Sequence, residues 1–503
     1  MTSYIGITIG PIVSTMLLTS TPAGLWAASY MFSELSKRIC LKLPKKSIIT
    51  PQFPDGEPET KGVGLFPDRI IFKAEGLPFK DIQPLIVEAI GEVAELLCMQ
   101  GQSVPAMQSY LRDYIQVHAV AFDTNETPIF HSRNFLAAAE MERSFAQKDD
   151  GTLFAQFEWR DREKEDDEKE ETEEEKNTGS KSRAVKNSTL VKSLKQNWPL
   201  WQNPEQQKQI RDLADIASNG KADYDETKNE YKFGKLLKKY RYYAVIQADG
   251  DNVGTAIGSL PAGEIEDFSK KCWEYSMAAA GIIRDYGGVP IYLGGDDLLA
   301  LAPVENDRKQ TIFFLLQDLR AAFKVAFGDD LIKKHSLALS FGVSIQYYKH
   351  PLYESFALAY HLLQEHAKKG NKNAIALRLQ KHSGQSVDLL FSDGESALLT
   401  ELTQQIDDLL KTQEEHDSTN LLLHSIMTHL RTQEAVFTAA LSSNNLKNTF
   451  KNVFRDSYVK QPKPFDDAQK LLELCAEQPE PLKVTDKLLR LLKFFVEEGD
   501  DRA

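Results

Sequence analysis

Two short acidic motifs contain the residues best suited to chemistry in this chain. Residues 249–252 have the sequence Asp-Gly-Asp-Asn, and residues 294–297 have the sequence Gly-Gly-Asp-Asp. The glycines permit a tight turn and let backbone amides approach a phosphate. Adjacent carboxylates repel each other unless a cation lies nearby, and Mg²⁺ bound to phosphates is the usual one. The two motifs together therefore predict a divalent-metal site for nucleotide chemistry.

The elements around these motifs must bring them together. Residues 242–248 are apolar and β-branched or aromatic, which predicts a buried strand that ends at Asp249. An amphipathic segment at 264–286 predicts a helix that crosses back over the sheet. Two short apolar runs then predict a hairpin with the Gly-Gly-Asp-Asp turn at its tip. We expect this order to place Asp249 beside Asp296 and Asp297 as metal ligands.

The pattern predicts an α+β fold with two ferredoxin-like domains and additional helical domains. After the hairpin we expect a helix, a strand, a helix and a strand, at 308–327, 337–345, 352–369 and 374–379. With the first strand this gives the βαββαβ order of a split βαβ unit. A looser copy without the acidic hairpin is expected earlier, with elements at 3–9, 23–42, 69–73, 80–100 and 114–122. Leu-rich stretches after 395 predict a helical bundle.

Composition sets further limits. The chain has 503 residues, 42% hydrophobic content and a net charge of −13, which favours a multidomain globular protein over a free-standing nucleic-acid binder. Its four cysteines are far apart, so we expect neither a zinc site nor a disulfide framework. Gly and Pro interrupt the apolar opening, and no Lys or Arg precedes it. We therefore expect no signal peptide and no membrane helix, and a cytoplasmic protein.

The motifs resemble a known family. The two acidic motifs are followed by Ser-Phe-Gly-Val at 340–343 and Ala-Lys-Lys-Gly-Asn-Lys-Asn at 367–373. This order resembles the palm domain that diguanylate cyclases share with the large subunit of type III CRISPR effector complexes. The opening, with Ile-Gly-Pro-Ile at 9–12 and Leu-Trp-Ala-Ala-Ser-Tyr at 25–30, is similar to the III-B form of that subunit (the Cas ten family, Cmr branch).

The resemblance implies a reaction and a set of partners. ATP would be joined 3′ to 5′ into cyclic oligoadenylate in antiviral defence, when an assembly of effector subunits and guide RNA binds target RNA. Asp249 and Asp296 would ligate Mg²⁺ or Mn²⁺, and Asp297 would complete the metal site or help deprotonate the attacking 3′-hydroxyl. The expected nucleotide-binding residues are Gly250, Asp251, Asn252, Gly294, Gly295 and Lys368.

The implied organisation has five parts. They are a degenerate first palm-like domain (1–160), an acidic disordered insertion (161–188), a helical linker domain (189–240), a catalytic palm (241–390) and a C-terminal helical domain (391–503). The palm region begins within ten residues of Met1, and His416-Asp417 is the sole His-Asp pair. The HD nuclease domain of longer relatives is therefore not expected, nor is nuclease activity.

Three other interpretations stay open. A diguanylate cyclase is disfavoured because that family has Glu-Phe after Gly-Gly-Asp, whereas Asp297 and Leu298 stand here. A free-standing nucleotide cyclase acting as a homodimer fits the acidic composition. A catalytically silent scaffold subunit of an RNA-guided complex is the third, although the intact acidic residues of both motifs argue against it.

Overall fold

The computed structural model describes residues 2–141 and 212–497, apart from 57, 59, 61, 76, 99–102, 126, 226, 229, 371, 393–395 and 412–415. The predicted acidic insertion at 161–188 lies outside these residues. The chain divides into two compact units, and we describe each by itself. The first unit comprises Met1–Asp212, Val253–Ala280 and Pro290–Asp296, and the second comprises Leu213–Asn252, Gly281–Val289 and Asp297–Ala503.

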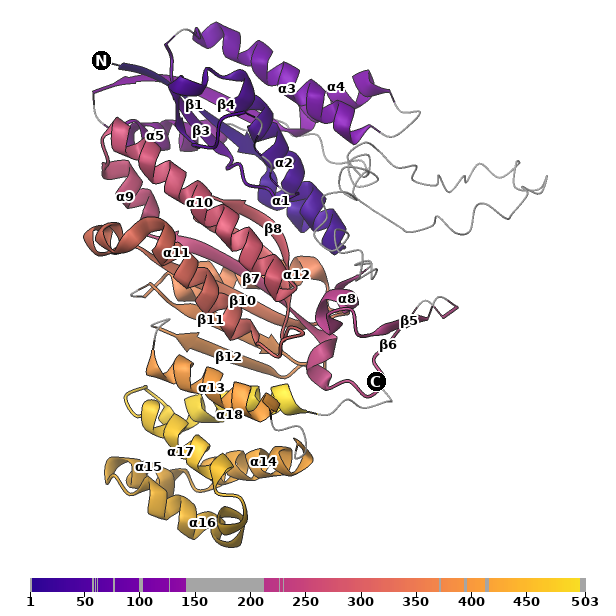
Figure 1. Cartoon of the computed structure of the whole chain (residues 1–503), viewed down its shortest axis with the longest axis vertical. Coiled ribbons are helices and arrows are strands. Elements are labelled where there is room, and N and C mark those ends of the chain that lie inside the picture. Colours follow the sequence, from indigo (N-terminus) through magenta and orange to yellow (C-terminus); the bar gives the residue numbers. More distant parts are fainter. Residues whose placement is uncertain are drawn as a thin grey trace, which may run out of the picture. The chain divides into compact units, whose positions relative to one another are not determined.

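The first unit has a four-stranded sheet in the order β2-β3-β1-β4. Its elements, labelled in Figure 1 where there is room, are β1 (Thr2–Gly10), α1 (Ile12–Leu17), α2 (Pro22–Lys42), η1 (Lys45–Ser47), β2 (Ile48–Thr50), β3 (Arg69–Lys73), η2 (Phe79–Asp81), α3 (Ile82–Leu97), α4 (Val104–Tyr114), β4 (Gln116–Thr124), α5 (Pro128–Glu140), α9 (Val253–Ser259), most of α10 (Ala262–Tyr286) and most of β8 (Val289–Gly294). Because β1 pairs antiparallel with both β3 and β4, the order is that of the split βαβ unit, as predicted.

The second unit contains five neighbouring strands of a larger sheet, in the order β12-β11-β10-β7-β9. Its elements are α8 (Leu213–Ser218), β5 (Asp223–Asp225), β6 (Glu230–Lys232), η3 (Lys238–Arg241), β7 (Tyr242–Asp251), β9 (Asp297–Pro303), α11 (Ile312–His335), β10 (Ala338–Tyr347), α12 (Leu352–His361), the π-helix η4 (Leu362–Ala367), β11 (Ile375–Gln380), β12 (Ser386–Phe391), α13 (Ala397–Lys411), α14 (His416–Thr432), α15 (Glu434–Ser442), α16 (Leu446–Lys460), α17 (Lys463–Leu474) and α18 (Pro481–Val496). In the middle of this sheet, β7 pairs antiparallel with β9 and β10, while β11 pairs parallel with β10.

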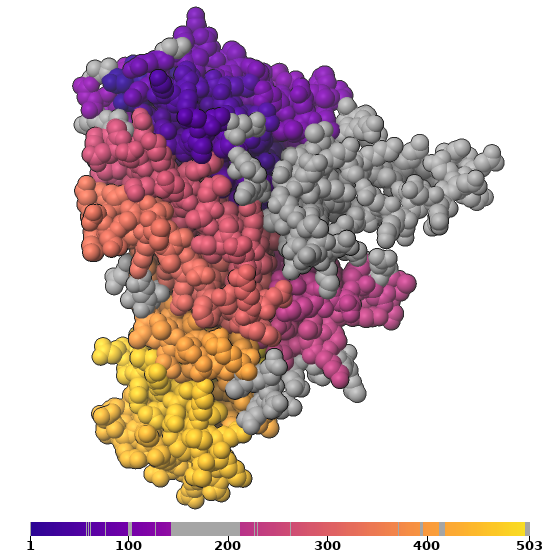
Figure 2. Space-filling model, in the orientation of Figure 1, coloured from indigo at the N-terminus to yellow at the C-terminus, as the bar shows by residue number. Residues whose placement is uncertain are grey.

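The core of the second unit follows from the sequence of β7. Residues Tyr243, Ala244, Val245 and Ile246 have no exposed surface, as expected for a strand covered on both faces. Helix α11 contacts β10, and α12 contacts both β10 and β7. Figure 1 draws α11 in front of these strands and α12, fainter, behind them. The C-terminal helices gather at the yellow end of the chain, which Figure 2 shows next to the orange residues that precede them.

Most predicted elements occur with ends shifted by a few residues, and three predictions need correction. The first strand of the second sheet does not end at Asp249 but continues to Asp251, because β10 pairs with it up to Ala338↔Asp251. The helix expected at 352–369 changes to a π-helix at Leu362. An additional strand, β12, follows β11 and pairs antiparallel with it.

The helical linker predicted at 189–240 is wrong in its described part. After the short helix α8, strands β5 and β6 form an antiparallel hairpin. Its turn is fixed by the Asp225 carboxylate, which accepts hydrogen bonds from the backbone N–H of Thr227 at 3.0 Å and of Lys228 at 3.3 Å. Tyr224 and Tyr231 pack across the strands with ring centroids 4.9 Å apart. Residues 189–211 lie outside the described part of the chain.

The boundary predicted at 240/241 also differs from the observed units. The first unit includes most of α10, because Ser269 of that helix contacts the loop after β2. Its Oγ accepts a hydrogen bond from the backbone N–H of Gln52 at 2.9 Å. Trp273, one turn later, packs edge-on against Phe66 with ring centroids 5.3 Å apart. These contacts join residues that are more than 200 positions apart. A unit that contains both partners therefore cannot be one continuous segment of the chain.

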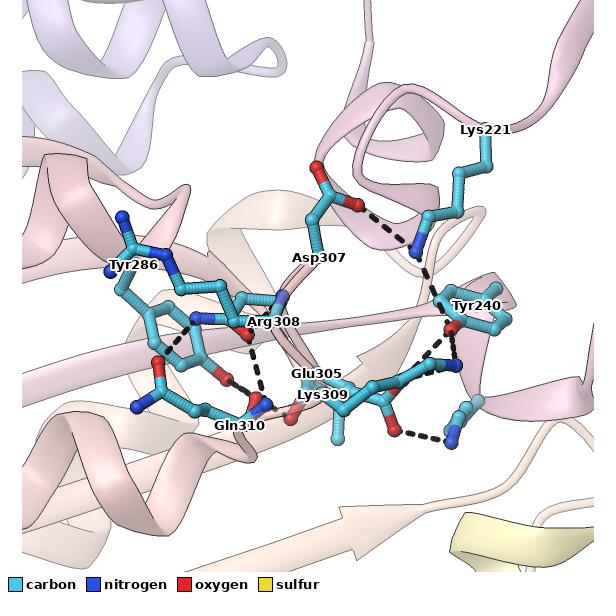
Figure 3. Close-up of polar contacts among 11 residues, drawn as sticks. Lys221, Tyr240, Tyr286, Glu305, Asp307, Arg308, Lys309 and Gln310 are labelled. Atoms are coloured by element: carbon cyan, nitrogen blue, oxygen red, sulfur yellow. Dashed lines mark hydrogen bonds and ion pairs between the residues drawn. The ribbon is translucent and has the colours of Figure 1, made fainter. Parts of the chain in front are cut away.

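A buried ionic cluster lies at the end of β9 (Figure 3). The carboxylate of Glu305 accepts hydrogen bonds from Lys239 Nζ at 2.5 Å and from the Tyr240 hydroxyl at 2.8 Å. The Lys239 and Glu305 side chains are 1% and 0% exposed, and burial lowers the pKa of Lys239 to about 8. Lys309 lies 3.4 Å from Glu305 and is partly exposed. The cluster ties η3, which leads into β7, to the residues that follow β9.

Within the described ranges, no helix is long and apolar enough to cross a bilayer.

Candidate nucleotide site

The carboxyl end of β7 holds one half of the predicted site. Its register with β9 ends at Ala248↔Leu298, whereas its register with β10 continues to Asp251. Residues 249–251 are therefore paired on the β10 side and not with β9. Asp249 and Asp251 project from one face of the strand because side chains alternate along it. Two carboxylates thus lie at a strand end that β10 pairs with and β9 does not.

Lys368 contacts this strand end directly. Its ammonium group forms an ion pair with Asp249, and Nζ donates a hydrogen bond to the Gly250 carbonyl oxygen at 3.3 Å. Both side chains are largely buried, with 18% and 23% of their surface exposed. Burial raises the pKa of Asp249 above its ordinary value, and the Lys368 charge opposes that rise. The predicted phosphate-binding lysine and the predicted metal ligand are therefore in contact.

Asp251 has a different environment. One carboxylate oxygen, Oδ2, accepts hydrogen bonds from Ser340 Oγ at 2.6 Å and from the Asn373 backbone N–H at 2.8 Å. The other oxygen, Oδ1, is buried and has no hydrogen-bond partner within the described residues. The side chain is 1% exposed. Asp251 therefore anchors the loop after Lys368.

Asn252 is in the left-handed backbone region at φ 63°, which non-glycine residues adopt rarely. Its side chain donates to the Ser336 carbonyl at 2.8 Å and accepts from Lys372 Nζ at 2.8 Å. Lys372 and Asn373 are left-handed as well, at φ 62° and 49°. Such strained residues persist where the surrounding contacts hold them, often at functional sites.

The second acidic motif lies mostly in the first unit. Gly294 is the last residue of β8, and Gly295 and Asp296 form the turn after this strand. Gly295 has φ +79°, a conformation that strongly favours glycine. Its carbonyl oxygen accepts a hydrogen bond from Ser276 Oγ of α10 at 3.1 Å. The turn is therefore held against α10, and Asp297, which is exposed, begins β9 in the second unit.

A cavity of about 170 Å³ in the first unit is lined by Asp296. Trp273, Ile257 and Leu65 supply apolar walls, and Ser269 and Gln52 supply polar atoms. Burial raises the pKa of the Cys272 thiol, which also lines the cavity, and the Asp296 charge adds to the rise. The Cys272 thiol is therefore protonated at neutral pH, so it is not a reactive thiolate. The cavity offers an aromatic wall and a carboxylate side by side.

The carboxylate and carbonyl oxygen atoms of the two acidic motifs are of the chemical type that binds a divalent cation. Carboxylates and a backbone carbonyl are the hard ligands that Mg²⁺ prefers. The buried oxygen Oδ1 of Asp251 accepts no hydrogen bond from the described residues. Within the part of the chain that the structure describes, no three His, Cys, Asp or Glu side chains gather as a metal-binding group. The ligand set of Asp249, Asp296 and Asp297 therefore stays a prediction.

The structure brings together five of the predicted residues in the second unit: Asp249, Gly250, Asp251, Asn252 and Lys368. It places Gly294, Gly295 and Asp296 together in the first unit. Sequence reasoning assigned no role to Ser340 or Lys372, which hold Asp251 and Asn252. The position of Lys372, four residues after Lys368, could have suggested a role for it. Its left-handed backbone could not be predicted from the sequence.

The fold and site define a protein with two palm-type α+β domains, of which the second has an acidic strand end. Residues 242–376 match the family model described as "Cas10/Cmr2, second palm domain". This part of the chain is therefore similar to the second palm domain of Cas10/Cmr2 proteins. The prediction from the motifs at 249–252, 294–297, 340–343 and 367–373 is thereby confirmed.

Relatives are similar over part or all of the chain. The "CRISPR system Cmr subunit Cmr2" of Pyrococcus furiosus is 29% identical over 176 residues, which cover 29% of this chain and 19% of that protein. A solved Csm1-Csm4 cassette in complex with pppApA has a TM-score of 0.54 at 12% identity, and the match covers 98% of this chain and 69% of that one. The apo Type III-B Cmr-beta structure has a TM-score of 0.50 at 13% identity, with 85% and 75% coverage. At such identities the two structures show the fold alone.

Proposed function

We propose that this chain is the large subunit of a type III CRISPR effector complex and a metal-dependent cyclase that makes cyclic oligoadenylate from ATP. The observation that carries the proposal is the contact of Lys368 with Asp249 at the carboxyl end of β7. There, cations that suit phosphates lie beside carboxylates that suit a metal. The family of the second palm supports the effector role.

The residues have separate parts in this proposal. Asp249, Asp296 and Asp297 would hold Mg²⁺ or Mn²⁺, which when bound neutralises charge on the transferring phosphoryl group. Lys368 and Lys372 bind phosphate oxygens of ATP, and the Gly295 turn lets backbone amides approach them. Asp297 accepts the proton of the attacking 3′-hydroxyl. A bond forms between O3′ and the α-phosphorus, the bond from that phosphorus to pyrophosphate breaks, and pyrophosphate leaves.

The cavity beside Asp296 gives the nucleotide a further contact. The Trp273 indole and its apolar neighbours suit a planar base, since stacking on aromatic side chains tolerates any base. The similar Csm1-Csm4 cassettes were solved with pppApA and with AMPPNP, which are adenine nucleotides. This ligand chemistry supports ATP as the substrate of this chain.

The proposal is tested with the purified chain, and with its native complex, incubated with labelled ATP and Mg²⁺ or Mn²⁺. Replacing either turn carboxylate, in Asp296→Asn or Asp297→Asn, should lower the rate of cyclic product by about 100-fold or more, as expected for lost transition-state stabilisation. Asp285→Asn, an exposed carboxylate of α10, is the matched control and should leave the rate unchanged.

Three outcomes contradict the proposal. Product that persists in both turn variants removes the assigned site. Product from GTP alone favours the diguanylate interpretation. Absence of product from the chain and from its target-bound complex indicates a catalytically silent scaffold.

A further inference from the structure

The helix that leads to Lys368 packs very close to the sheet at Gly342. A Cβ atom added to Gly342, in the middle of β10, would clash with the Ala359 carbonyl oxygen and lie 2.5 Å from the Leu363 backbone nitrogen. Both atoms belong to the main chain, so no change of rotamer relieves the clash. Glycine is therefore required for α12 and η4 to lie at their observed distance from β10.

The helix changes from α to π one turn before the lysine. The Lys368 backbone N–H donates to the Leu363 carbonyl oxygen at 3.0 Å, five residues back instead of four. One extra residue in a turn rotates the next residues by about 100° relative to an α-helix with 3.6 residues per turn. The inner side of the π turn is fixed by buried contacts among Leu362, Leu363, Ala367, Ala374 and Ala376.

The rotation sets which of two adjacent lysines faces the end of β7. Lys368 is 18% exposed and contacts Asp249, whereas Lys369 is 64% exposed and pairs with Glu365 on the helix surface. We propose that Gly342 and the π turn together position Lys368 at the end of β7, so that Gly342 controls phosphate binding without touching the nucleotide. The role of Lys368 in this statement depends on the proposed function; the placement of its side chain does not.

The first experiment is a crystal structure of Gly342→Ala in the full-length chain. The added methyl group should push α12 and η4 outward and separate Lys368 Nζ from Asp249 by more than about 4 Å, the limit of an ion pair. Gly281→Ala on α10, where a Cβ atom meets nothing within 4 Å, is the matched control. Lys368 still in contact with Asp249 in Gly342→Ala overturns the proposal.

The second experiment measures binding of ATP and of adenosine. Gly342→Ala should weaken ATP binding about tenfold or more, the equivalent of one charge-assisted hydrogen bond, and leave adenosine binding unchanged. In a Lys368→Met background the same change should have no further effect on ATP, because the two residues act as a unit. Leu363→Ala is the control for destabilisation, since it empties the same core without displacing the helix.

Equal effects of Gly342→Ala and Leu363→Ala on ATP binding would show a role in stability alone and contradict the proposal. Insertion of one alanine after Glu365, which turns the following residues by about 100° and leaves Gly342 unchanged, serves if Gly342→Ala does not fold. It should also abolish the contact of Lys368 with Asp249 and weaken ATP binding. If the unmodified chain binds no ATP, the proposed function fails, while the crystallographic distance still tests the placement of Lys368.

Discussion

Burial and the Lys368 ammonium group have opposite effects on the pKa of Asp249. Loss of hydration favours its protonated form, and the charge of Lys368 favours its ionised form. Burial is the larger effect, so the pKa lies above the ordinary value of 3.8. A protonated Asp249 cannot ligate a metal. Metal binding here therefore requires a higher pH than it would at an exposed aspartate.

This balance predicts the acid limb of the pH–rate profile. Activity, measured as kcat/KM for ATP, should fall as the pH decreases through the Asp249 pKa, and that limb should lie above pH 3.8. Lys368→Met removes the charge that lowers the pKa, so the limb should move to higher pH. Lys369→Met, an exposed neighbour, should leave it in place. A limb that stays or moves to lower pH in Lys368→Met would contradict this assignment.

At the residue scale, the site was predictable where chemistry shows in residue type. Asp249, Asp251, Asn252 and Lys368 stand in motifs whose carboxylates, glycines and lysine have few other reasons to occur together, and the structure brings these four into one place. The role of Ser340 was not predictable, because a serine in a strand has no periodic signature. It becomes visible only through its hydrogen bond to Asp251.

Among the elements, β7 depends on a buried ion pair at its start. Lys239 in η3 and Glu305 after β9 hold its entry, and removal of one partner would leave the other charged and without its counter-ion in the core. The sequence did not indicate this cluster because Lys and Glu are ordinary surface residues. It also did not indicate the β5–β6 hairpin, whose short polar strands lack a clear alternating pattern.

We expect Lys239→Met to lower the free energy of unfolding by about 3–5 kcal/mol, the usual effect of breaking a buried pair. The double variant Lys239→Met/Glu305→Gln should lose less, because no buried charge is then left without its partner. Lys221→Met removes the exposed pair with Asp307 and should cost at most about 1 kcal/mol. Denaturant unfolding of the four proteins measures these differences. A double variant less stable than Lys239→Met would show that the unpaired charge of Glu305 does not cause the loss of stability in Lys239→Met.

For the whole molecule, the two sheets were predictable and their division into units was not. Strand and helix periodicity indicates the order of elements, and the predicted strands have the order of a split βαβ unit, to which the unpredicted strands β2 and β12 are added. The assignment of most of α10 and the Gly295 turn to the first unit depends on tertiary contacts such as Trp273 with Phe66. Contacts of this kind between distant residues leave no local signal in one sequence.

The net charge of −13 bears on partners. A chain this acidic has little long-range attraction for RNA by itself, so we expect RNA to be held by other subunits of an effector complex. Isolated from its native host at moderate salt, the tagged chain should co-purify with further subunits and with guide RNA, as gel filtration and nuclease digestion would reveal. Recovery of a homodimer without RNA would contradict the effector role and favour the free-standing cyclase.

The one-sided pairing at the end of β7 has a consequence for amide hydrogen exchange. Residues 243–248 are paired on both sides, so their amides should exchange slowly, close to the rate set by global unfolding. Residues 249–251 are paired with β10 alone and should open more often. A nucleotide and metal bound at the open edge should slow exchange at these three amides more than anywhere else in β7. Exchange mass spectrometry would then locate the ligand without an assay of turnover.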